Sequence, residues 1–109
     1  MAYDEELVVR VRSLLGSQSK IAEINMMGGL VFMVNGNMCC GVSDEQLMVR
    51  VSRDRHDSLI AMRNVTPVVK GNRPMIGFLK IGGDAIESDS GLKWWVDAAL
   101  DHNRTLPPK

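Results

Sequence analysis

The sequence has 109 residues, a length that fits one domain with its own hydrophobic core. Hydrophobic residues make up 45% and charged residues 24%, and 13 basic side chains balance 13 acidic ones. This composition is typical of a globular protein, and it is neither that of a disordered chain nor the basic balance of a dedicated nucleic-acid binder. The N-terminus is acidic and lacks a signal-peptide pattern, and no apolar run approaches the ~20 residues of a membrane span. We therefore expect a cytoplasmic domain with no membrane contact.

The first predicted element is an amphipathic helix that follows Asp4 and ends at Gly16. Asp4 is a good N-cap, and Glu5 and Glu6 suit the positive end of a helix. Apolar residues then recur at helical spacing over 7–15.

The clearest local signal is the dipeptide Asn35-Gly36, which is typical of a type I′ turn between two antiparallel strands. We predict strands over 30–34 and 37–42 on either side of it. Because both faces of 30–34 are apolar, we expect that strand to be central and well covered. A two-residue loop predicts three cross-strand pairs, which are Val34 with Asn37, Met33 with Met38, and Phe32 with Cys39.

Weaker signals follow along the rest of the chain. Alternating residues predict a strand over 47–51, a short helix begins at Ser52 or Asp54, and 76–81 is a further strand. The stretch 65–74 holds two prolines and a glycine, so we interpret it as a loop or an irregular edge. A last helix starts near Asp89 or Ser90 and ends before the prolines at 107–108.

These elements predict an α+β fold over 1–109, as a single domain. Consecutive strands joined by short turns imply an antiparallel sheet, with the helices packed on one face in a two-layer arrangement. The expected order is helix, three or four strands, helix, one or two strands, helix.

Several of these segments together resemble the N-terminal domain of the TfoX/Sxy competence-regulator family. The resemblance covers nearly the whole chain, and it rests on an ordered series of motifs rather than on any single one. The series comprises Gly28-Gly29-Leu30, the hairpin 32–42, the strand 47–51, Arg73-Pro74-Met75 with Gly77, Trp95-Val96, and the ending 106–109.

The resemblance implies a two-layer α/β fold in the order one helix, three strands, one helix, two strands, one helix. It also implies a regulatory role, because longer members promote natural competence as transcriptional coactivators. Those members carry a second, helical domain, and this sequence ends where that domain would begin. Its absence weakens the expectation of a DNA-linked role.

The adjacent pair Cys39 and Cys40 is the first candidate for chemistry. Neighbours on a strand point to opposite faces, so the two thiols do not share one metal ion, and we expect one in the core and one partly covered. His56 is expected to be exposed on a helix. No motif of a nucleophile, a phosphate loop or a metal site is present, so we expect no catalytic, cofactor or metal site and no enzyme.

The leading hypothesis is a non-enzymatic regulatory or protein-interaction module with an unidentified protein partner, or one that self-associates as a homodimer. At 100° per residue, the last helix places Trp95 on its apolar face and Trp94 almost opposite, beside acidic residues. Exposed tryptophan is enriched at binding hot spots, so Trp94 is the candidate anchor.

Two alternatives remain open at this stage. Residues 50–80 hold seven basic and two acidic side chains, so the first is a nucleic-acid-associated module, although we expect no specific duplex DNA binding. It depends on whether the candidate residues Arg50, Arg53, Arg55, Lys70 and Arg73 gather on one surface. The second alternative is a thiol or metal site at the cysteine pair. The many methionines around the predicted sheet also have two interpretations, as core filler or as a soft surface for a partner segment.

Overall fold

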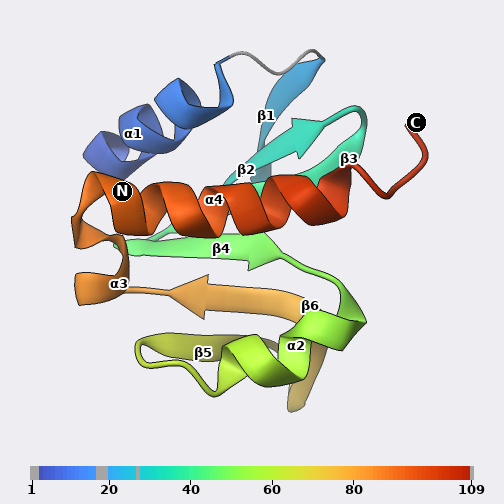
Figure 1. The fold of residues 1–109 in the computed structure, drawn as a ribbon. Helices are drawn as coiled ribbons and strands as arrows, with labels where there is room; N and C mark the ends of the chain where they lie inside the picture. The colour runs from blue at the N-terminus through green and yellow to red at the C-terminus, as the bar shows by residue number, and fades with distance from the viewer. Residues whose placement is uncertain (1–2, 17–19, 27, 109) are drawn as a thin grey trace.

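The computed structural model describes residues 3–16, 20–26 and 28–108, and all elements below lie within them. Their order along the chain is shown in Figure 1. The helices are α1 (Glu5–Leu15), α2 (Arg53–Ile60), α3 (Asp84–Glu87) and α4 (Asp89–Asn103). The strands are β1 (Ile21–Met26), β2 (Gly29–Val34), β3 (Asn37–Ser43), β4 (Gln46–Arg50), β5 (Val65–Lys70) and β6 (Arg73–Ile81).

The six strands form one antiparallel sheet in the order β1-β2-β3-β4-β6-β5. Figure 1 shows α1, α2 and α4 on the same face of this sheet, with α4 across its middle and α2 over β5 and β6. The α+β class with helices on one face is therefore confirmed. We call the helix-covered side of the sheet the inner face and the other side the outer face.

The prediction of a loop or irregular edge at 65–74 is wrong in part, because most of this stretch is a strand pair. β5 is an edge strand, and a proline is tolerated there because an edge strand leaves alternate N–H groups without a partner. The pairing is irregular between Pro67 and Val69, where the register shifts. The short turn at 71–72 then leads directly into β6.

The hairpin between β2 and β3 forms as predicted, with positive φ values of 55° at Asn35 and 81° at Gly36. The register differs from the prediction after two pairs, since Phe32 pairs with Cys40 and not with Cys39. The cause is a β-bulge, in which one extra residue on β3 faces β2. As a result Cys39 and Cys40 both lie in the inner core and are fully buried, which corrects the expectation that one is only partly covered.

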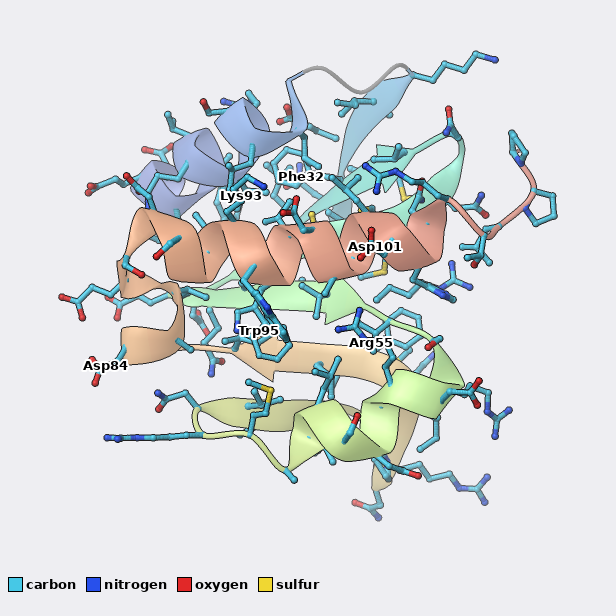
Figure 2. The ribbon with its side chains drawn as sticks, viewed as in Figure 1. Phe32, Arg55, Asp84, Lys93, Trp95 and Asp101 are labelled. Atoms are coloured by element: carbon cyan, nitrogen blue, oxygen red, sulfur yellow. The ribbon has the colours of Figure 1, made fainter. Side chains whose placement is uncertain are left out.

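The main core lies between the sheet and the helices. Its members are apolar residues of α1, α4 and the inner face, among them Val11, Phe32, Leu79 and Trp95, all fully or almost fully buried. In Figure 2, Trp95 and Phe32 point from α4 and β2 into this layer. The expectation that β2 is central and well covered is confirmed, because it lies between β1 and β3 and its residues are buried or half-buried. On its outer side Val31 is buried by Met38 and Met48, since no described helix packs there.

Side-chain caps set where the helices begin. The Asp4 carboxylate accepts hydrogen bonds from the N–H groups of Glu6 (2.9 Å) and Leu7 (3.3 Å), which starts α1 as predicted. Ser52 caps α2 in the same way. Within the described residues no helix is long and apolar enough to cross a membrane.

The prediction of an exposed His56 is wrong, because the side chain is buried against β6. Its Nδ1 accepts a hydrogen bond of 2.9 Å from the backbone N–H of Gly77. Gly77 has φ +91°, a conformation that favours glycine, and this kink in β6 turns its N–H towards α2. The kink turns the Gly77 N–H away from the neighbouring strands, and His56 supplies the hydrogen-bond acceptor that this N–H requires.

Candidate functional site

Helix α4 separates its two tryptophans between the core and the surface. Trp95 is 3% exposed and belongs to the core, whereas Trp94 is 46% exposed. The rings meet edge to face, with centroids 4.8 Å apart and planes at 80°. The outward position of Trp94 agrees with the helical spacing, and its edge contact with a buried neighbour limits the orientations that the exposed ring can adopt.

A cation from a second helix also lies against Trp94. The guanidinium carbon of Arg55, on α2, is 5.9 Å from the centroid of the Trp94 ring, and Figure 2 shows Arg55 pointing towards α4. The next two turns of α4 bear Asp97 and Asp101, whose carboxylates pair with Lys93 (2.6 Å) and Arg104 (3.0 Å) on the same helix. We call the surface formed by Trp94, Arg55, Asp97 and Asp101 the Trp94 patch.

The other basic candidates do not join Arg55 on one surface. Arg53 is exposed at the start of α2. Arg50 lies at the end of β4 with its guanidinium 5.7 Å from the centroid of the Phe78 ring. Lys70 and Arg73 face each other across the β5–β6 turn. The five candidates are thus divided: Arg53 and Arg55 lie on α2, whereas Arg50 and Lys70 lie with Lys80 on the outer face, and Arg73 lies at the adjoining β5–β6 turn.

A second surface was only partly foreseen from the sequence. The outer face carries an apolar cluster of its own, separate from the core, made of Val31, Met38 and Met48 with Met33 and Phe78 packed around them. Beside it lies a hollow of about 530 Å³ lined by Met26, Val68, Val69, Lys70, Met75 and Lys80. The many methionines had two interpretations from the sequence, as core filler or as a soft surface. The sequence did not show which of them lie on the side of the sheet that the helices leave uncovered.

The cysteine pair offers no reactive thiol. Both side chains are fully buried, and neither forms a disulfide. The pKa of Cys40 lies well above its ordinary value because its thiol is hydrogen-bonded to Cys39 and because burial disfavours the thiolate. Since thiolates are the reactive and metal-binding form, this environment favours a structural role.

The acidic side chains gather elsewhere, around the N-terminal end of α1. One hollow of about 650 Å³ is lined by Tyr3, Asp4, Asp44, Glu45 and Gln46. Across the described ranges, no three His, Cys, Asp or Glu side chains come together as metal ligands. The hollow also brings no nucleophile and base together, so it presents no arrangement for catalysis.

A comparison with protein-family models matches residues 13–103 to the TfoX N-terminal domain. The chain belongs to the TfoX N-terminal domain family. The match spans α2, α4 and every strand, so the Trp94 patch and the outer face both lie inside the TfoX N-terminal domain. Searches of curated proteins and of solved structures returned no match.

Membership of the TfoX N-terminal domain family suggests a regulatory or competence-related module, and this family is not a known enzyme family. The Trp94 patch and the rim of the outer face are the two surfaces described above that expose large apolar side chains.

Proposed function

We propose that this domain is a non-enzymatic regulatory module that acts by binding another protein through the Trp94 patch, in a process linked to competence or transcription. The partner is a different protein or a second copy of the chain. A cytoplasmic location is part of the proposal.

The observation that carries the proposal is the restrained exposure of Trp94. Nearly half of the side chain is open to solvent, while Trp95 holds its edge and Arg55 lies over its ring. An aromatic side chain that is already ordered loses little conformational entropy on binding, and tryptophan and arginine are the residue types most enriched at hot spots. The surrounding carboxylates have partners on α4, so they add a polar rim to an apolar centre.

The nucleic-acid alternative has weaker support. A phosphate-binding surface requires cations gathered along one face, whereas the five candidates are divided between α2 and the outer face, and the sequence has no excess of basic residues. We expect any binding to DNA to be weak and to fall steeply with salt, because it would depend on phosphate contacts alone. Sequence-selective binding below micromolar Kd at physiological salt would contradict this.

The test is affinity capture from nuclease-treated lysate with three forms of the tagged domain: wild type, Trp94→Ala and Val9→Ala. Val9 is the matched control because it is an apolar side chain on a helix, 58% exposed, and outside the Trp94 patch. We expect Trp94→Ala to weaken retention of at least one protein by about tenfold or more, since hot-spot truncations cost 2 kcal/mol or more. If the partner is a second copy, light scattering should show a dimer that this substitution alone dissociates. Equal retention by all three forms, with no change in mass, would refute the proposal.

A further inference from the structure

The outer face of the sheet is apolar where a solvated face should be polar. An antiparallel sheet with one wet side normally alternates apolar and polar residues along each strand. Here Val31, Met33, Met38, Met48 and Phe78 occupy outward positions of the middle strands and pack on one another. Exposed Ile24 and Met26 of β1 continue this surface to the sheet edge. Packing within the cluster buries Val31, Met38 and Met48, so the exposed apolar surface is the rim that includes Ile24, Met26 and Val69. Exposed apolar surface of this kind marks interaction sites.

The outer face is also concave. Met26 comes from β1 at one edge of the sheet, and Val68, Val69 and Lys70 come from β5 at the other edge, yet all four line the same hollow of about 530 Å³. The sheet must therefore curve so that both edges rise around the middle strands. Val31 and Met48, fully buried without any helix above them, lie on the floor of this curve.

All the charge on the outer face is positive. Only five residues of the described strands are charged, and Glu23 is the single acidic one. Its carboxylate bonds with Arg12 of α1 at 2.7 Å, so it points to the inner face. Arg50 lies over Phe78, and Lys70 and Lys80 line the hollow. The carboxylates outside the strands belong to the helices, the α1 cap and the β3–β4 turn.

From these three observations we propose that the outer face is a docking groove for a segment of another protein that combines apolar side chains with acidic ones. The apolar side chains occupy the methionine-lined hollow, and the acidic ones meet Arg50, Lys70 and Lys80. Methionine suits such a role because its flexible, polarizable side chain adapts to different apolar shapes. Charge complementarity gives the acidic partner its selectivity.

The same charges disfavour other occupants. A second copy docked face to face would bring the basic residues of both copies together with no acidic side chain between them. A single-stranded nucleic acid needs aromatic platforms for its bases, and the one aromatic ring of the cluster, Phe78, is already under Arg50.

The test uses a synthetic amphipathic peptide of about 18 residues, with leucines at helical spacing and glutamates elsewhere. A second peptide has lysine in place of every glutamate. Binding is followed by NMR of protein labelled with ¹³C at the methionine methyl groups. We expect the acidic peptide to shift the methyl signals of Met33, Met38, Met48 and Met75, while Met62, which lies beyond α2, stays unchanged as an internal control.

Two test variants and two control variants make the result specific to the outer face. Lys80→Gln should weaken binding of the acidic peptide roughly five- to tenfold, as loss of an interfacial charge does, and Met26→Gln should weaken it by a similar factor. Lys93→Gln on α4 is the matched control and should leave the affinity unchanged. Trp94→Ala should also leave it unchanged, because the proposal is independent of the Trp94 patch.

Five results would overturn the proposal. The first four are equal binding of both peptides, no methyl shift at millimolar acidic peptide, methyl shifts that follow protein concentration alone, and displacement of the acidic peptide by oligo-dT. The third would assign the face to a second copy and the fourth to nucleic acid. The fifth is a lower Kd for dodecanoate, a fatty-acid anion, than for the acidic peptide, since the groove would then fit a small amphipathic anion.

Discussion

The two adjacent tryptophans allow a paired perturbation within one helix. Trp95→Ala removes a side chain that is 3% exposed in the main core, and Trp94→Ala removes one that is 46% exposed at the surface. Both substitutions leave alanine, the best helix former, so propensity does not separate them. The difference between the two stabilities therefore reports mainly on burial, with a smaller part from the contact of Trp94 with Arg55.

The expected losses follow from the buried areas. An aromatic side chain buries roughly 150–250 Å², and at about 25 cal/mol per Å² this gives ~4–6 kcal/mol for Trp95 as an upper bound. Truncations of a buried aromatic side chain to alanine cost about 3–5 kcal/mol, and we expect this loss for Trp95→Ala. About half of that area is buried at Trp94. Because the unfolded chain already buries part of this surface, the loss is again smaller than the area alone gives, and we expect ~1–2.5 kcal/mol, including the contact with Arg55. Helical spacing alone predicts almost no loss at Trp94, so its contacts with Trp95 and Arg55 raise the expectation.

The assay is guanidinium unfolding followed by circular dichroism, with a thermal melt in parallel. At about 4–6 °C per kcal/mol for a chain of this size, Tm should fall by roughly 5–15 °C for Trp94→Ala and at least 12 °C for Trp95→Ala. The free energy of unfolding of the two variants should differ by about 2 kcal/mol. Equal losses would refute the outward placement of Trp94, and with it the Trp94 patch.

Three further predictions concern titration, thiols and backbone. Burial, and then the positive charge of Arg50, lower the pKa of His102 from its ordinary value of 6.5. The folded state therefore resists protonation, so stability is full above about pH 6.5 and falls below it as the unfolded chain takes up the proton. NMR titration should give a midpoint below 6.5 that Arg50→Gln raises only in part, and a midpoint above 6.5 would contradict this. Cys39 and Cys40 should react with a disulfide reagent only after unfolding, and Cys39→Ala with Cys40→Ala should cost at most a few kcal/mol; rapid labelling of the native protein would contradict their burial. Gly77→Ala should cost about 1–3 kcal/mol in a denaturant titration, because an alanine strains at φ +91° and its Cβ would lie 3.0 Å from a backbone carbonyl oxygen; an unchanged midpoint would show that β6 has no such kink.

The sequence predicted those features that depend on neighbours in the chain. Asp4 caps α1 because its carboxylate needs only the next two or three N–H groups. Asn35 and Gly36 form their turn because both tolerate positive φ. Helical spacing placed Trp95 inside and Trp94 outside, since the angle between neighbours on a helix is fixed.

The predictions that were wrong or incomplete concern features that depend on contacts between segments far apart in the sequence. The bulge at Cys39 depends on how β3 pairs with β2, and nothing in the pair of cysteines reveals it. His56 is buried because the kink at Gly77 presents a backbone N–H to α2, 21 residues away in sequence. The uncovered outer face could not be read from β2, because an apolar strand has the same sequence whether a second layer covers it or a partner does.

The most direct test of the protein-binding account is photo-crosslinking in living cells. A photoreactive amino acid at position 94 is compared with the same residue at position 9, since Val9 is 58% exposed on α1 and outside both surfaces. The account predicts a discrete protein adduct, either with another protein or with a second copy, from position 94 and none from position 9. The absence of any adduct from position 94, or the same adducts from both positions, would contradict it.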